Sequence, residues 1–226
     1  MNTIINSITG DDFTAYANSI LKNSKVGINC ILGESSRVYS CDLSNNVRVD
    51  RNNFLLATQL GDYSYTGQFT VIMHSVIGKF CSISWGVTIG AGEHDYNKLT
   101  THDFLYNRNC DLNNGQESYD RFEKKLSIGN DVWIGANSTI IRGVVISNGA
   151  IIGANSVVTK DVPAYAIVAG CPAKLVKFRF PKDIILRLEK LNWWDLPPEI
   201  IKNKFESFAS NDIESAIDSL ELEKKI

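Results

Sequence analysis

The segment from Ile128 to Pro163 repeats an aliphatic residue at every sixth position. The column consists of Ile128, Ile134, Ile140, Ile146, Ile152 and Val158. An α-helix turns through about 600° over six residues, so this column would wander around a helix. In an extended chain the first and fifth residues of a hexad point to one face. The fifth residues are also small or medium in size: Val132, Ser138, Val144, Ala150, Ser156 and Val162. The repeat therefore predicts one short strand and one turn per hexad.

The residues between the two buried positions are suited to turns. Gly129, Gly135 and Gly153 share this part of the hexad with Asn137 and Asn155. Glycine and asparagine tolerate left-handed backbone angles, which a turn between two strands requires. Strands stacked about 4.8 Å apart would bury the aliphatic column as a continuous core. This pattern indicates a parallel β-helix of hexapeptide repeats. A sandwich of short strands fits a strict six-residue period less well.

The same spacing occurs in the first half of the chain, with a slip of one residue. The aliphatic positions are Val26, Leu32 and Val38, then Leu43, Val49 and Leu55, then Val71, Ile77, Ile83 and Ile89. Cys30 and Cys81 stand at fifth positions, so we expect both thiols in the core.

The hexads divide the chain into parts. We expect an amphipathic helix in residues 1–25, the β-helix in 26–180 and helices in 181–226, broken at Pro197–Pro198. These last helices are expected to close the open end of the stack. Residues 95–127 have no hexad pattern and are expected to form a long excursion on one face. The expected fold class is thus all-β, with C-terminal α-helices added.

Composition excludes several classes of protein. The net charge is −2, so no broad basic field would attract nucleic acid or anionic lipid. A membrane-spanning helix needs an apolar run of at least about 18 residues, and the sequence contains none, so no membrane span is expected. The first residues lack the basic and apolar stretches of a secretion signal, which favours a cytoplasmic protein. The five cysteines form no CxxC motif, so neither a disulfide framework nor a metal site is expected.

The stretch "IGNDVWIGANSTIIRGVVISNGAIIGANSVVTKDVPAYAIVAGCPAKLVK" resembles the C-terminal coils of hexapeptide-repeat acyltransferases. With "LGDYSYTG", "IGKFCSIS", "GAGEH" and "LNWWDLPPEII", it resembles the xenobiotic (chloramphenicol and streptogramin) acetyltransferase branch over roughly residues 55 to 207. The stretch "GAGEHDYNKLTTHDFLYN" is most similar to acetyltransferases of capsule and O-antigen clusters, although Asp95 and Asp103 replace two prolines. The resemblance implies a left-handed parallel β-helix, acetyl-CoA as donor, and homotrimers with each active site between two subunits.

Acetyl transfer from a thioester to a hydroxyl needs a base for the hydroxyl proton and donors for the oxyanion. Histidine suits the first task because its ordinary pKa is about 6.5. By resemblance, His94 is the catalytic base. Asp95, Glu93 or a backbone carbonyl would orient its other nitrogen. His102 lies in the excursion and is a candidate acceptor contact, whereas His74 is expected in a solvated turn.

The resemblance also assigns the residues that bind the donor. Trp133 would lie near the acetyl group, the Ala136 N–H near the thioester carbonyl, Ala154 along the pantetheine arm, Thr159–Lys160 near adenine, and Lys174 and Lys177 near the phosphates. For the two lysines, a solvated surface is the alternative. The sequence Gly-Ala-Asn occurs at Gly135 and again at Gly153, three hexads later. Since three hexads make one full coil in the family, the two alanines are expected to stack.

The acceptor site is less marked in the sequence. Tyr63, Tyr65, Asp95 and Tyr96 are candidates together with His102, because aromatic and hydrogen-bonding groups suit a sugar. Packing between the excursion and its surroundings is the alternative for the tyrosines. The pair Trp193–Trp194 is expected to anchor a helix on the coils.

These observations lead to a functional hypothesis. The chain is expected to be an acetyl-CoA-dependent O-acetyltransferase that acts on a sugar of a bacterial surface polysaccharide or its precursor. The alternatives are an antibiotic (streptogramin or chloramphenicol) O-acetyltransferase, a nucleotide-amino-sugar N-acetyltransferase and a trimeric scaffold without activity.

Overall fold

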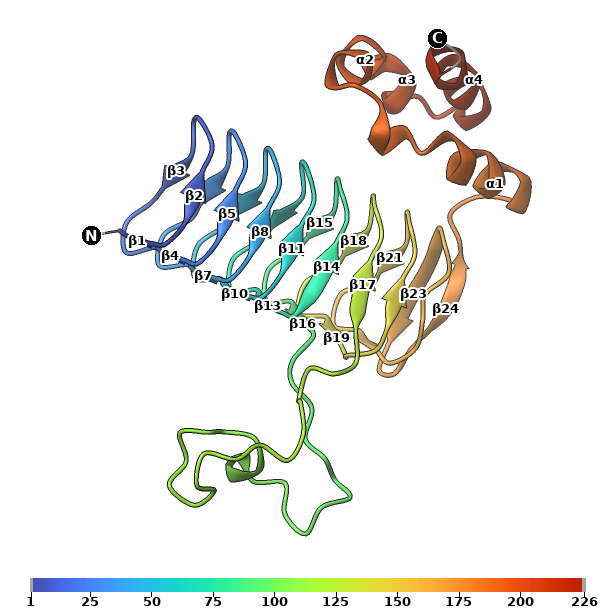
Figure 1. The fold of residues 1–226 in the computed structure, drawn as a ribbon. Helices are drawn as coiled ribbons and strands as arrows, with labels where there is room; N and C mark the ends of the chain where they lie inside the picture. Colours follow the sequence, from blue (N-terminus) through green and yellow to red (C-terminus); the bar gives the residue numbers. More distant parts are fainter. Residues whose placement is uncertain (1, 225–226) are drawn as a thin grey trace.

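The computed structural model describes residues 2–224 as a three-sided coil of short strands, with a long excursion and a group of C-terminal helices (Figure 1). The strands form three sheets, here named A, B and C.

Sheet A has eight strands, in spatial order β1 (Thr3–Ile5), β4 (Ile20–Lys22), β7 (Arg37–Tyr39), β10 (Phe54–Leu56), β13 (Val71–Met73), β16 (Thr88–Ile89), β19 (Thr139–Ile140) and β22 (Val157–Val158). Sheet B has seven, β2 (Ile8–Thr9), β5 (Lys25–Val26), β8 (Asp42–Leu43), β11 (Gln59–Leu60), β14 (Ser75–Ile77), β17 (Leu126–Ile128) and β20 (Val145–Ile146). Sheet C has nine, β3 (Thr14–Ala15), β6 (Ile31–Leu32), β9 (Arg48–Val49), β12 (Tyr65–Thr66), β15 (Ser82–Ile83), β18 (Trp133–Ile134), β21 (Ile151–Ile152), β23 (Ala166–Gly170) and β24 (Ala173–Phe178).

Each coil passes through sheets A, B and C in turn, so the turns form three edges along the stack. We call these edges the AB, BC and CA corners. All neighbouring strands pair in parallel except β23 and β24, which are antiparallel. Each of the three corners carries a different part of the molecule.

The coil length changes along the stack. Thr3 pairs with Ile20 and Ile20 with Arg37, so each of these coils is one residue shorter than three hexads. Beyond the excursion Thr139 pairs with Val157, which is the full length of three hexads. The shorter coils arise because one turn in three comes after five residues: Asn18 and Asn23 both have left-handed φ, of 59° and 52°. The expectation of three hexads per coil is therefore correct only for the last coils.

The expected helix in residues 1–25 is wrong. The strands β1 to β4 fill this segment, and left-handed turns at Asn6 and Asp12 separate them. Phe13, Ile20 and Leu21 have a spacing that also fits a helix, which explains the error. Their strands hydrogen-bond to the next coil, as in Thr14 N to Cys30 O at 2.9 Å, and this pairing selects the β conformation.

The aliphatic column forms the core, as the hexads predict. The first and fifth positions of the hexads from Ile128 to Val162 are all buried. The two fifth-position serines are satisfied, because Ser138 donates to Gly153 O at 2.9 Å and Ser156 accepts from Gly170 N at 3.1 Å. Cys30 and Cys81 are buried thiols, which confirms the expectation for both.

The C-terminal helices lie beside the last coils, against the BC corner (Figure 1). They are α1 (Lys182–Leu191), α2 (Pro198–Asn203), α3 (Phe205–Ala209) and α4 (Ile213–Lys224), with a 3₁₀ turn η2 (Trp193–Asp195) between the first two. Trp194 is buried, and Trp193 contacts Phe80 with ring centroids 4.8 Å apart, so the tryptophan pair anchors the helices as expected. The described helices are all too short or too polar to cross a membrane.

Candidate functional site

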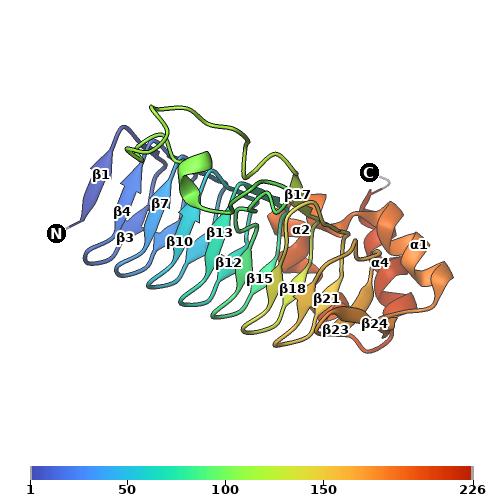
Figure 2. The same ribbon diagram turned by 90° about the horizontal axis from the view of Figure 1, so that it is seen from below.

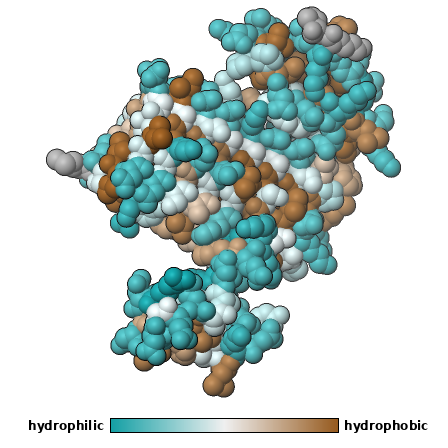
Figure 3. All heavy atoms as spheres, viewed as in Figure 1, coloured by the Kyte–Doolittle hydropathy of each residue, from teal (hydrophilic) through white to brown (hydrophobic). Residues whose placement is uncertain are grey.

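The excursion leaves the stack after β16 and returns at β17, which places it at the AB corner. It contains one 3₁₀ turn, η1 (Asp103–Leu105), and projects away from the coils (Figure 1) while leaning toward the N-terminal coils (Figure 2). Figure 3 shows it as a separate, mainly hydrophilic lobe. Its two ends must therefore be held by a small number of contacts at the corner.

Arg142 holds both ends of the excursion. Its side chain is buried, with 3% of the residue exposed. The guanidinium donates to carbonyl oxygens on the outgoing limb, on the returning limb and on the coil below. The acceptors are Gly90 O (2.9 Å), Phe122 O (3.1 Å), Lys124 O (2.5 Å), His74 O (3.3 Å) and Met73 O (3.4 Å). The hydrogen-bond acceptors are all backbone carbonyl oxygens, and no carboxylate within residues 2–224 accepts a hydrogen bond from the guanidinium. Burial lowers the pKa of Arg142, and the charges of Asp120 and Glu93 oppose this effect.

Phe122 and His74 complete this neck of the excursion. Their rings stack with centroids 3.8 Å apart and planes at 12°, and the Arg142 guanidinium lies 5.2 Å from the Phe122 ring. Burial, together with the charge of Arg142, lowers the pKa of His74. His74 is thus a half-buried packing residue, and the solvated turn expected from the sequence is wrong.

His94 lies on the outgoing limb of the excursion. Its Nδ1 is 2.6 Å from the carbonyl oxygen of Thr101. A carbonyl oxygen only accepts, so Nδ1 carries the hydrogen and Nε2 has the free lone pair. The ring of Tyr106 meets the imidazole edge-on at 5.4 Å and limits its rotation. The structure therefore selects a backbone carbonyl among the three orienting groups that the sequence left open.

The two carboxylates that the sequence offered are engaged elsewhere. Glu93 pairs with Lys124 at 2.8 Å, and Asp95 accepts from Asn97 N at 3.0 Å.

His94, Asp95 and Tyr96 line a cavity of about 230 Å³ together with Glu93, Asn97, Tyr119, Asp120, Arg121, Glu123 and Lys124. Most of these side chains are charged or polar. The buried hydroxyl of Tyr119 has no hydrogen-bond partner among residues 2–224. The cavity therefore offers many hydrogen-bonding groups and little apolar surface to a bound molecule.

His102 has a local role. Its Nδ1 accepts from Phe104 N at 3.3 Å and lies 3.0 Å from a carboxylate oxygen of Asp103, so it caps η1. It does not line the cavity beside His94.

Tyr63 lies at the BC corner, where its ring stacks on Phe80 at 4.9 Å. The structure thus places Tyr63 with the anchor of the C-terminal helices, neither beside His94 nor against the excursion, so the expected acceptor contact and the expected packing on the excursion both differ from what is found.

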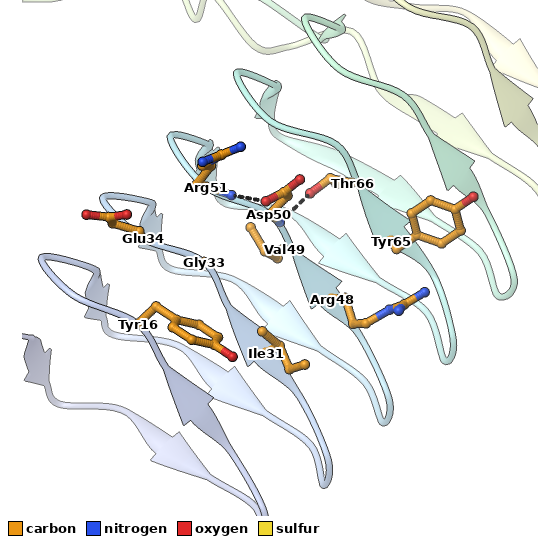
Figure 4. Close-up of a pocket in the computed structure, with 10 residues that line it drawn as sticks. All are labelled: Tyr16, Ile31, Gly33, Glu34, Arg48, Val49, Asp50, Arg51, Tyr65 and Thr66. Carbon is orange, nitrogen blue, oxygen red and sulfur yellow. Dashed lines mark hydrogen bonds between the residues drawn. The ribbon is translucent and has the colours of Figure 1, made fainter.

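Tyr65 and Trp133 share the outer face of sheet C. Tyr65 pairs with Ser82, and Ser82 pairs with Trp133, so the two aromatic rings are two coils apart in one column. Tyr65 also lies 5.4 Å from the guanidinium of Arg48. Figure 4 shows Arg48, Tyr65 and Tyr16 around a groove of about 540 Å³ on this face. The groove belongs to the N-terminal coils, away from the excursion.

Ala136 and Ala154 stack at the CA corner, as their spacing predicts. Asn155 N donates to Ala136 O at 2.8 Å, and a Cβ at Gly135 would lie 2.5 Å from Ala154 N. Glycine is therefore required at position 135 for the coils to approach. The N–H groups of both alanines have no hydrogen-bond partner within residues 2–224. They are available to a ligand that lies along this corner.

Lys174 and Lys177 share one face of the sheet. Lys174 pairs with Ala169 and Lys177 with Ile167, because a bulge between Ile167 and Val168 corrects their odd spacing. Ile167 follows Ile151, which follows Trp133, in the column on sheet C. The two lysines thus lie on the same outer face as Trp133. Thr159 and Lys160 follow β22 and lie at the AB corner instead.

Two residues that matter in the structure were not predicted from the sequence, Arg142 and Trp85. Arg142 stands in a turn of the hexad pattern, where an arginine is ordinarily solvated, so the sequence carries no signal of its burial. Trp85 is 57% exposed in the turn after β15. A bulky apolar residue in a turn position was the available signal for it.

One chain does not bring all these groups together. His94 is carried from the AB corner, whereas the free N–H groups lie at the CA corner and Trp133 on sheet C. Among residues 2–224, no group of three His, Cys, Asp or Glu side chains could hold a metal ion.

Comparison with known proteins identifies relatives. Residues 126–160 match a family model described as bacterial transferase hexapeptide (six repeats). Over 139 residues the chain is 41% identical to a probable macrolide acetyltransferase of Lysinibacillus sphaericus, covering 60% of this chain and 77% of that protein. It is 38% identical over 143 residues to a chloramphenicol acetyltransferase of Morganella morganii, covering 61% and 67%. AntD, an N-acyltransferase from Bacillus cereus solved with dTDP and 3-hydroxybutyryl-CoA, aligns with a TM-score of 0.57 at 25% identity, covering 77% of this chain and 92% of AntD.

Proposed function

This chain belongs to the family of hexapeptide-repeat acetyltransferases, and we propose that it transfers acetyl from acetyl-CoA to a hydroxyl of a sugar in a bacterial surface polysaccharide or its precursor. Its fold is the left-handed parallel β-helix of that family. The proposal depends most on one observation: the contact between His94 Nδ1 and Thr101 O, which leaves Nε2 able to accept a proton.

His94 acts as the general base. Nε2 takes the proton of the acceptor hydroxyl as its oxygen attacks the thioester carbonyl carbon. The tetrahedral intermediate then collapses, the carbon–sulfur bond breaks, and the imidazolium returns the proton to the departing thiolate. The Thr101 carbonyl stabilises the imidazolium because it accepts from Nδ1 throughout.

The CA corner and sheet C bind the donor. The free N–H of Ala136 would stabilise the oxyanion, and that of Ala154 would bind the pantetheine arm. Trp133 would cover the acetyl end. Lys174 and Lys177 share a face with Trp133, as groups that bind one extended ligand should, and two cations suit its phosphates.

The active site is proposed to form between two subunits of a homotrimer. The excursion with His94 leaves the AB corner, and the donor groups lie at the CA corner and on sheet C. With a three-fold axis along the stack, the excursion of one subunit would reach the CA corner of its neighbour. Thr159 and Lys160 lie at the AB corner of the subunit that supplies the excursion. From there they would bind the adenine end of the donor.

The lining of the cavity beside His94 supports a sugar acceptor. Asp95 and Tyr96 belong to a lining that is mostly charged or polar. Pockets for drug-like molecules are predominantly apolar with few polar groups. A polyhydroxylated acceptor makes better use of these side chains. We leave Tyr63 and His102 out of the acceptor site because their contacts are with Phe80 and η1.

A second candidate acceptor is an antibiotic hydroxyl. Several relatives are named as chloramphenicol or macrolide acetyltransferases, at 37–41% identity. The same base and the same oxyanion donor would serve that reaction.

An acetyl-CoA consumption assay tests both candidates. The acceptors are nucleotide sugars, oligosaccharides, chloramphenicol and a streptogramin A. Turnover of the antibiotics alone would overturn the sugar proposal. His94→Ala should lower kcat by about 100-fold or more. His102→Ala is the matched control, since its ring caps η1, and should keep most activity. Equal activity of the two variants would exclude His94 as the base.

A further inference from the structure

Trp85 is an exposed indole without a partner. Within residues 2–224 its side chain, 57% exposed, takes part in no ring stacking, no cation–π pair and no hydrogen bond. Trp193 and Trp194 show the contrast, because both pack against neighbouring rings. A large amphipathic ring left open on a surface marks contact with a ligand or another chain.

Its position relative to Ala136 is fixed by the backbone. Asn137 N donates to Trp85 O at 3.0 Å, just as Asn155 N donates to Ala136 O at 2.8 Å. The CA corner therefore presents Trp85, Ala136 and Ala154 on successive coils, about 4.8 Å apart.

Trp133 lies in the same coil as Ala136. It precedes Ala136 by three residues, and it pairs with Ser82, which precedes Trp85 by three residues. Ala136, with its free N–H, thus has one exposed indole in the neighbouring coil, Trp85, and another in its own coil, Trp133.

The excursion starts at the same level of the stack. It leaves from the coil that contains Trp85 and returns into the coil that contains Ala136. Subunits related by an axis along the stack have equivalent coils at equal heights. A neighbour's excursion would therefore approach the CA corner at the height of these two residues, which brings a base and Trp85 to one level.

We propose that Trp85 is the platform on which the ring of the acceptor binds, a specificity-determining role that rests on the proposed function. Along the stack, the pantetheine arm of the donor occupies the surface from Ala136 toward Ala154. The surface from Ala136 toward Trp85 therefore remains for the acceptor. The indole stacks on the flat apolar face of the acceptor, and this places a hydroxyl of the same ring beside the thioester carbonyl. The CH face of a pyranose and the aryl ring of an antibiotic both supply such a face.

Steady-state kinetics of Trp85→Ala test the inference, with chloramphenicol and the methyl glycosides of glucose, galactose and mannose as acceptors. The KM of the accepted compound should rise about 10-fold, which corresponds to the loss of one ring stack. Trp85→Phe should recover most of this loss. Phe69→Ala is the matched control, since Phe69 is 59% exposed at the same corner but one coil farther from Ala136.

Two further measurements separate the alternatives. The Kd of coenzyme A, from titration calorimetry, should change less than about 2-fold in Trp85→Ala, because the indole is proposed to stack on the acceptor and not on coenzyme A. Light scattering should give the same oligomer as for the unmodified protein. Three results would each overturn the proposed role of Trp85: an unchanged KM of the acceptor, a loss of the oligomer, or a rise in the Kd of coenzyme A as large as the rise in the KM of the acceptor.

The proposed function fails in a different way. In that case the unmodified protein binds no coenzyme A and consumes no acetyl-CoA with any acceptor. Indole fluorescence of the coenzyme A complex, titrated with the same four compounds, provides a test without turnover. A response that Trp85→Ala abolishes supports the platform, and a response that the variant retains, or no response, contradicts it.

Discussion

Replacing Arg142 with methionine removes the cation that holds both limbs of the excursion while keeping an apolar stem against Phe122. The three shortest bonds, to Gly90, Phe122 and Lys124, are 2.5–3.1 Å long. Hydrogen bonds to a charged group contribute about 1.5–3 kcal/mol each, and these three together are worth about 4.5 kcal/mol at the lower end. Removal of the buried charge offsets about 1.5 kcal/mol of this loss. The docked excursion should therefore lose about 3 kcal/mol, roughly a 150-fold shift toward the detached form.

The assay combines hydrogen exchange with kinetics. Amide protection in residues 90–125 should fall most near Gly90 and Phe122, because those limbs lose their anchor. In Arg142→Met the kcat should drop at least about 10-fold, since His94 is carried by this segment and small misplacements are costly. The Kd of coenzyme A should stay the same, because its proposed contacts are at the CA corner and on sheet C.

A conservative variant and a matched control make the prediction refutable. Arg142→Lys keeps the charge but reaches fewer carbonyls, so kcat and protection should be intermediate. Arg37→Met removes an exposed arginine from β7 and should leave both unchanged. The anchoring role of Arg142 is refuted if Arg142→Met matches Arg37→Met in amide exchange and in kcat. It is also refuted if coenzyme A binding weakens in step with kcat.

Two further predictions concern thiols and phosphates. Burial raises the pKa of Cys41 to about 11 and of Cys81 to about 12, so at pH 8 iodoacetamide should label exposed Cys171 and spare both core thiols. Peptide mass spectrometry measures the labelling, and modification of Cys81 in the folded protein would contradict the core assignment. The double change Lys174→Ala and Lys177→Ala should raise the KM of acetyl-CoA about 10-fold but leave that of acetyl-pantetheine unchanged, because only the first carries the 3′-phosphate and pyrophosphate. Equal effects on the two donors would show that the lysines do not bind phosphate.

The fold was predictable because its determinants are local. A hexad places its aliphatic residue, its small fifth residue and its turn within six positions, and each coil repeats this pattern. The N-terminal segment was mispredicted because the spacing of Phe13, Ile20 and Leu21 fits two structures. The choice between them depends on pairing with the next coil of the stack, which is a long-range interaction.

The site was predictable in part. The motif around His94 identified the candidate base, but every residue has a carbonyl oxygen, so sequence could not single out Thr101. Arg142 was missed for a similar reason, because its burial comes from limbs of the chain that are distant in sequence and meet only at the AB corner. Tyr63 was misplaced because its partner Phe80 lies on the next coil, one turn of the stack away.

The early coils all have the same length, because each strand pairs in the same register with the strand of the next coil. Deleting or inserting one whole coil before β16 would shorten or lengthen the stack and leave every later side chain on its present face. A deletion or insertion one residue shorter than a coil would instead move buried side chains to the outer face. The number of N-terminal coils can thus vary in evolution, or by engineering, one coil at a time and without moving the functional residues that follow β16.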